Sequence, residues 1–262
     1  MGSPRPPPWV RAARLVLTVA LLACAGGLSR GKPPDAGPPL SGEAPLPYVR
    51  GPSAWEYDSN FGRALVRLEE HGVRGGVRTY TWSLVIGPMR AGMTEVLHLS
   101  AAGLFVAVRE FHLAGVPLVR FRFDTPELVI PAPLQTGQRW RASSTVRGPD
   151  GDGLTTVDGE VLAREPVEVP AGRFLAYRIH LTRRDSWGGV VETLMWLDPE
   201  VGVVKADGWF RWHGAIGALQ RALSLDRLRV ELVVARVRRT AEATSRSLPP
   251  PAAAGLPPPA GG

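Results

Sequence analysis

The stretch VRTYTWSLVI at residues 77–86 decides the fold class, because large apolar side chains alternate along it with small or polar ones. The bulky members share one parity: Tyr80, Trp82, Leu84 and Ile86. A period of two is typical of a β-strand that buries one face. The stretch therefore predicts a half-buried strand.

The same alternation recurs over most of residues 93–234. Residues 118–123 set three apolar side chains against two arginines, and residues 226–234 repeat the arrangement near the end of the chain. The connections are short, and PDGDG at 149–153 and WGG at 187–189 suit tight hairpins. Because short connections make neighbouring strands antiparallel, we expect a mainly β domain. It would be a single antiparallel meander that forms a curved sheet, half-barrel or barrel.

One or two short helices are expected beside the strands. From Tyr57 to His71, three large apolar residues recur at helical spacing, and Gly72 follows where a helix could end. The three are Phe61, Leu65 and Leu68. A second, shorter helix is expected from Ile216 to Leu223.

The first 23 residues have the three parts of an export signal: a positively charged start, an apolar run at 15–23 and small residues after it. The run is far shorter than the ~20 residues that a spanning helix needs. It ends in Leu-Leu-Ala-Cys24, which resembles the lipobox of bacterial lipoproteins. The resemblance implies that Cys24 carries diacylglycerol and palmitate and begins the mature chain. The alternatives are an ordinary signal peptide with a chance cysteine and an uncleaved N-terminal anchor.

Composition divides the remaining chain into three parts. Residues 24–52 are rich in Pro and Gly and predict an extended linker. Residues 53–240 hold the β domain, and residues 241–262 form a Pro/Ala-rich tail with no hydrophobic period, which predicts disorder. We expect the protein to be exported and lipid-anchored, either at an outer membrane or on the outer face of a plasma membrane.

Charge and cysteine usage exclude several classes of function. The net charge is +7, and it falls to +4 without the three arginines that precede Cys24. Arginines alternate with apolar residues rather than forming a basic block, so no nucleic-acid partner is expected. A single cysteine allows neither an intramolecular disulfide nor an all-cysteine metal site.

Three turn motifs stand out, in chain order: PLQTGQRW at 133–140, VPAGRF at 169–174 and WLDPEVGVVK at 196–205. Together they resemble the TapB-like family of bacterial envelope proteins, which is similar to the lipoprotein-carrier half-barrels. The resemblance spans about residues 60–237. It implies a β fold, export and frequent lipid anchoring, and it carries over no catalytic residue. Arg173 and the aromatic stretch after Lys205 depart from the family pattern.

That aromatic stretch is the candidate binding site. On a strand, one face would carry Phe210 and Trp212 and the other Trp209, Arg211 and His213. The five residues could form an aromatic ligand rim with Arg211 or His213 as its polar contact. The alternative is a core on one face and a packed barrel mouth on the other.

No catalytic signature is present: there is no G-x-S-x-G elbow, no H-E-x-x-H helix and no phosphate-binding glycine loop. The five histidines are scattered, and the acids at 150–160 fail the EF-hand spacing, so no metal and no cofactor are expected. Paired carboxylates can still meet in space, and Asp58, Asp185 and Glu192 are the acids to check.

The leading hypothesis is therefore a non-enzymatic lipoprotein of the bacterial envelope. Its partners would be the membrane, through the lipid, and either an apolar small molecule or an envelope protein bound by the curved sheet. Two alternatives stay open. One is a structural or assembly component of the envelope, and the other is an envelope hydrolase with a carboxylate or histidine site built across strands.

Overall fold

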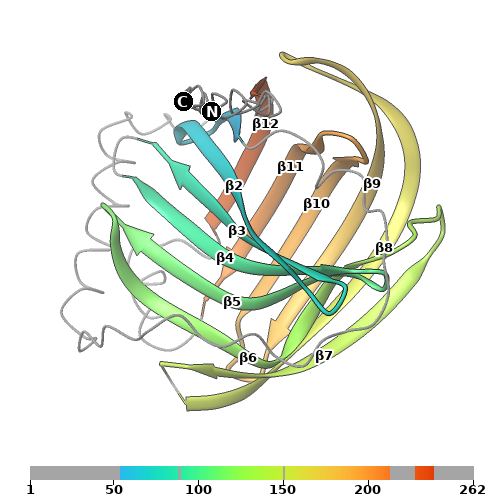
Figure 1. Cartoon of the computed structure of the whole chain (residues 1–262). Helices are drawn as coiled ribbons and strands as arrows, with labels where there is room; N and C mark the ends of the chain where they lie inside the picture. Colours follow the sequence, from blue (N-terminus) through green and yellow to red (C-terminus); the bar gives the residue numbers. More distant parts are fainter. Residues whose placement is uncertain (1–53, 88–89, 150, 213–227, 239–262) are drawn as a thin grey trace, which may run out of the picture.

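The computed structural model describes residues 54–87, 90–149, 151–212 and 228–238, which form one closed β-barrel (Figure 1). Every ladder between neighbouring strands is antiparallel, and the strands follow one another around the barrel in chain order. The strands are β1 (Ala54–Ser59), β2 (Gly62–Arg74), β3 (Val77–Ile86), β4 (Ala91–Ser100), β5 (Gly103–Leu113), β6 (Val116–Pro131), β7 (Arg139–Gly148), β8 (Gly151–Val169), β9 (Gly172–Asp185), β10 (Val190–Asp198), β11 (Gly202–Arg211) and β12 (Leu228–Arg238). The predicted antiparallel meander is confirmed.

Of the three expected shapes, the barrel is the one found and the half-barrel is wrong, because the short strand β1 closes the ring. Ala54 pairs with Arg67 of β2 on one side and with Arg238 of β12 on the other. An open sheet would leave two rows of unpaired backbone groups at its edges, and closure pairs them.

The expectation of a helix from Tyr57 to His71 is also wrong. This segment forms the end of β1, a turn at Phe61 and most of β2, which begins at Gly62 with φ of +103°. Inward-facing residues here alternate along β2, and pairing on both sides outweighs the local helical spacing. The described residues contain no helix, and residues 216–223 lie outside them.

One end of the barrel, where Ala54 pairs with Arg238, is filled by an apolar cluster; we call it the terminus end. Trp55 Nε1 donates to the carbonyl of Val201 at 2.7 Å, and Tyr57 Oη donates to the carbonyl of Val203 at 2.5 Å. Both rings thus lie fixed among buried aliphatic side chains.

The long β8–β9 hairpin reaches across the barrel to this cluster. The amide of Ala171, in its turn, donates to the carbonyl of Val234 in β12 at 3.2 Å. Val169 and Ala176, on either side of the turn, pack in the same cluster as Trp55. The yellow tip of the hairpin rises above the neighbouring strands in Figure 1.

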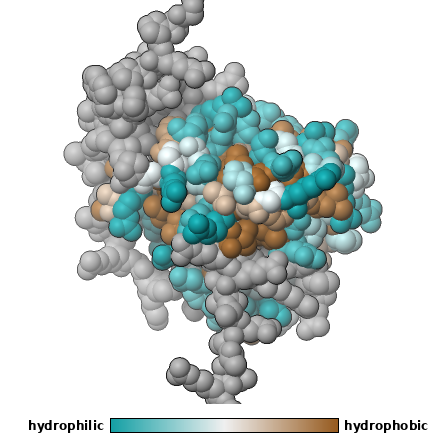
Figure 2. Space-filling model, turned by 90° about the horizontal axis from the view of Figure 1, so that it is seen from above, coloured by the Kyte–Doolittle hydropathy of each residue, from teal (hydrophilic) through white to brown (hydrophobic). Residues whose placement is uncertain are grey.

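Seen from above, hydrophobic residues gather in the middle of the molecule and hydrophilic residues border them (Figure 2).

Side chains also fill the middle of the barrel. Val146, Val161 and Ile179 are fully buried, and Trp140 lies against Gly159, where an added Cβ would come within 2.1 Å of the ring. The barrel is therefore a packed core over most of its length.

The outer face of β7–β9 carries charged side chains that pair across strands. Arg139 contacts Glu160 at 2.8 Å, and Asp158 lies 3.2 Å from Arg141 and 2.8 Å from Arg184.

In the described part of the chain, no helix is long and apolar enough to cross a bilayer.

Candidate functional site: a pocket at the barrel mouth

A pocket lies at the end of the barrel opposite the terminus end, lined by residues of β5, β6, β8, β9, β10 and β11 and of the β9–β10 turn; we call this end the mouth. The pocket leaves about 40 Å³ for the centres of water-sized molecules, within about 440 Å³ of empty space that includes open solvent. Its main lining residues are Phe111, Phe121, Arg183, Trp187, Val191 and Trp212. Small-molecule sites favour this combination of aromatic walls and a few polar groups.

The aromatic rings of the mouth form a connected wall. Phe111 meets Phe121 edge-on at 6.3 Å between ring centroids and meets Trp212 edge-on at 5.1 Å. Phe210 stacks on Trp212 at 6.2 Å, and Phe121 lies 6.2 Å from Trp187. These contacts join β5, β6, the β9–β10 turn and the end of β11, so the wall is held by several elements at once.

Trp187 reaches the pocket because its turn is tied down. Oδ1 of Asp185 accepts hydrogen bonds from the backbone N–H of Trp187 at 3.0 Å and of Gly189 at 2.8 Å. The indole lies beside Gly148 and Gly153, and a Cβ at Gly153 would come within 2.5 Å of it. Because the two glycines have no Cβ, the indole can lie flat against the backbone there.

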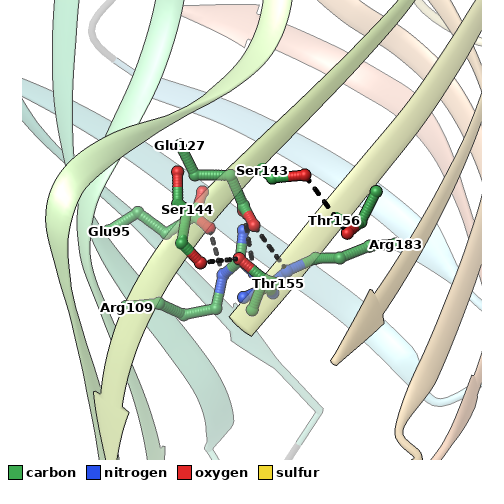
Figure 3. A network of polar contacts seen from close by, with 8 residues as sticks. All are labelled: Glu95, Arg109, Glu127, Ser143, Ser144, Thr155, Thr156 and Arg183. Carbon is green, nitrogen blue, oxygen red and sulfur yellow. Dashed lines mark hydrogen bonds and ion pairs between the residues drawn. The ribbon is translucent and has the colours of Figure 1, made fainter. Parts of the chain in front are cut away.

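Below the aromatic wall, two arginines and two glutamates form a buried cluster that we call the charged floor: Glu95, Arg109, Glu127 and Arg183 (Figure 3). Arg109 Nε contacts Glu95 Oε1 at 2.5 Å, and its Nη1 lies 3.9 Å from Glu127 Oε2. Arg183 Nε donates to Glu127 Oε1 at 3.1 Å, and the guanidinium stands over the ring of Phe123 at 5.3 Å. The four charges balance.

Glu127 is the most buried member of the floor, with 1 % of its side chain exposed. Burial raises the pKa of its carboxyl, while the nearby Arg109 and Thr155 oppose that rise. Its Oε2 finds no hydrogen-bond donor among the described residues. One side of this carboxylate is therefore held by Arg183, and the other lacks a matching donor.

The structure brings two of the predicted rim residues to the pocket. Arg211 and Trp212 line it, and Phe210 stacks on Trp212 from the same face of β11. Trp209 lies on the other face of the strand, in register with Glu192 and Arg229. The rim stays a prediction, since no bound ligand tests it.

Two predicted sites, Cys24 and His213, lie outside the described residues. The three acids marked for checking do not converge. Asp58 is exposed on β1, Asp185 serves the turn at Trp187, and Glu192 pairs with His180 at 3.0 Å on another part of the barrel.

Several residues of the site were missed from the sequence, and one signal could have found Arg183. Tyr177, Ile179 and Leu181 face the interior at every second position of β9. Arg183 is the next position of this series, so the alternation predicts that it also faces the interior. Glu127 gives no such signal, because β5 and β6 shift register on either side of it.

Metal and hydrolytic chemistry find little support in the described ranges. They contain no group of three or more His, Cys, Asp or Glu side chains able to hold a metal ion. Asp185 lines the pocket and serves the turn at Trp187. The interior carboxylates Glu95 and Glu127 are each turned toward a guanidinium of the floor. They are placed to balance arginines rather than to activate a water between them.

No family profile matches the chain, and a search of curated proteins found no match. Three solved structures are similar in part. An exported protein with a YmcC-like fold from Bacteroides fragilis has 12 % identity and a TM-score of 0.41, over 77 % of this chain and 98 % of that one. A lipoprotein from Parabacteroides distasonis has 12 % identity and a TM-score of 0.40, over 76 % and 100 %. The hypothetical lipoprotein YmcC from Escherichia coli has 10 % identity and a TM-score of 0.36, over 72 % and 86 %.

Proposed function

We propose that this chain is an exported bacterial lipoprotein, anchored through Cys24, whose barrel binds a small ligand with an apolar body in the mouth pocket. The observation that carries the binding proposal is the ring of aromatic side chains around open space at one end of an otherwise filled barrel. When a flat apolar ligand lies between these aromatic side chains, their faces lose contact with water, which favours binding.

The positions of the two ends support a tethered binding module. The linker that follows Cys24 joins the barrel at Ala54, which lies at the terminus end. The mouth is about 30 Å away along β11, at ~3.3 Å per residue. Twenty-nine residues separate Cys24 from Ala54, and a flexible chain of that length spans about 30 Å. The barrel would stand clear of the lipid headgroups, with its mouth open to the aqueous compartment.

The anchor is tested by Cys24→Ser. The wild type is expected to incorporate an alkyne-labelled palmitate and to fractionate with membranes. The variant should lose the label, and it should either leave the membrane or keep its signal segment. Equal labelling of the two proteins would refute the lipid anchor, and it would leave the binding proposal for the barrel unaffected.

The pocket is tested with indole, a neutral aromatic that is soluble in water, titrated into the full-length protein and followed by ligand-observed NMR. Val191→Trp adds a bulky indole to the aromatic rings that already line the pocket, and it should abolish binding by filling the space. Leu175→Trp is the matched control, because Leu175 is 48 % exposed on β9, the strand next to β10, near the terminus end. Binding that survives Val191→Trp, or that fails in the wild type, would exclude the mouth as a site for apolar ligands.

A further inference from the structure

One side chain of the charged floor, Arg183, lines the pocket. Its free donors indicate which chemical group the ligand carries. Arg183 lines the pocket with 19 % of its side chain exposed. Within the described chain it donates one hydrogen bond, from Nε to Glu127. A guanidinium carries five N–H donors in a planar fork, so the four donors on Nη1 and Nη2 remain.

The orientation of Arg183 is fixed before any ligand arrives. The bond from Nε to Glu127 holds one edge of the guanidinium, and the ring of Phe123 supports its face at 5.3 Å. A planar fork held in this way loses little conformational freedom when it binds, and it matches a carboxylate with two parallel hydrogen bonds.

The hydrogen-bond donors around the pocket, rather than its net charge, also favour an anion. Arg211 adds a second, exposed cation at the rim. Asp185 is the acid in the pocket lining, and its Oδ1 already accepts two backbone N–H groups. Glu127 does not line the pocket, and it divides its charge between Arg183 and Arg109. A ligand therefore meets more unsatisfied donors than acceptors.

We propose that the ligand is a small organic acid, with an aromatic or short acyl body between Phe121, Trp187 and Trp212 and a carboxylate on the Nη groups of Arg183. This inference rests on the proposed function, since it uses the same pocket. It makes Arg183 the residue that selects by charge, and it makes Glu127 a positioning residue that holds Arg183 in place.

The test compares three ligands with one ring system in the full-length protein: indole-3-acetate, an anion; indole, which is neutral; and tryptamine, a cation. The wild type should bind indole-3-acetate at least about tenfold more tightly than indole, because a charge-assisted bidentate pair is among the strong hydrogen bonds of proteins. Tryptamine should bind most weakly. Equal affinity for the three would overturn the inference and leave the apolar pocket standing, whereas no binding of any of them would refute the proposed function itself.

Arg183→Gln should reduce the affinity for indole-3-acetate to that for indole and leave indole unchanged. Arg184→Gln is the matched control: Arg184 is the next residue, faces outward and contacts Asp158 at 2.8 Å. If Arg183→Gln fails to fold, Arg183→Lys keeps the charge without the fork and should give an intermediate affinity for the anion. An unchanged preference for the anion in either Arg183 variant would overturn the assignment.

Discussion

Removing the carboxylate of Glu127 should destabilise the barrel more than any single change to its outer charges. Glu127 is 1 % exposed, and it faces Arg183 at 3.1 Å and Arg109 at 3.9 Å. Breaking a buried ion pair from one side typically costs about 3–5 kcal/mol, because the remaining charge is left without a partner. Glu127→Ala should lower the free energy of unfolding by that amount. At about 2–3 kcal/mol per molar urea, the unfolding midpoint should fall by more than about 1 M.

Two variants measured beside it make the reasoning refutable. Glu110→Ala removes a carboxylate that is 24 % exposed and lies 3.8 Å from Arg120, and an outer pair of this kind is worth about 0–1 kcal/mol. Glu127→Gln keeps an acceptor for Arg183 but removes the partner charge, so its loss of stability should be smaller than that of Glu127→Ala. The buried-pair argument fails if Glu127→Ala shifts the urea midpoint no further than Glu110→Ala does.

Two further predictions concern the floor and the packed middle of the barrel. Because burial raises the pKa of Glu127 in the folded state, its contribution to stability is fully present below the unfolded pKa of about 4.3 and is lost as pH rises through the folded pKa. The wild type should therefore lose stability relative to Glu127→Gln across that window, as urea titrations between pH 4 and 8 would measure; a constant difference would contradict the raised pKa. Gly159→Ala should cost about 1–3 kcal/mol by pushing a Cβ into Trp140, and Trp140→Leu in the same chain should recover part of that loss in a double-mutant cycle. Additive costs would mean that the two residues do not press on each other.

The meander could be predicted from the sequence because each strand carries its own evidence. Alternation over residues 77–86 requires no knowledge of the partner strand, and the glycine turns between runs limit the pairing to antiparallel neighbours. Closure could not be predicted in the same way. It depends on pairing Ala54 with Arg238 across nearly the whole domain, and no local pattern records a contact between the two ends of a meander.

The helix expected over β1 and β2 failed for a related reason. Leu65 and Leu68 lie at helical spacing, yet in the barrel they face opposite sides of β2, with Leu68 inside and Leu65 in register with Val85. A short segment contains too few turns for one period to exclude the other, and the ladders on both sides decide between them.

The site was partly visible for the same physical reason. Trp212 and Arg211 stand out because they belong to a dense aromatic stretch, whereas Phe111, Phe121 and Trp187 come from three distant segments that meet through the fold. Glu127 is the extreme case. The register of β5 and β6 shifts between Leu104 and Phe105 and again between Val106 and Val108, so the inward parity cannot be counted along the strand.

The charged floor has a physical cost that the rest of the barrel avoids. Apolar side chains of similar size would fill the same space without desolvating four charges, and such replacements are often neutral or stabilising. The terminus end and the middle are in fact filled with apolar side chains. The charges lie where the packed interior gives way to the pocket, and one of them, Arg183, lines the pocket while its Nε binds Glu127. Binding of a carboxylate ligand by that guanidinium would explain why charged residues lie beside the pocket, which their effect on stability does not explain.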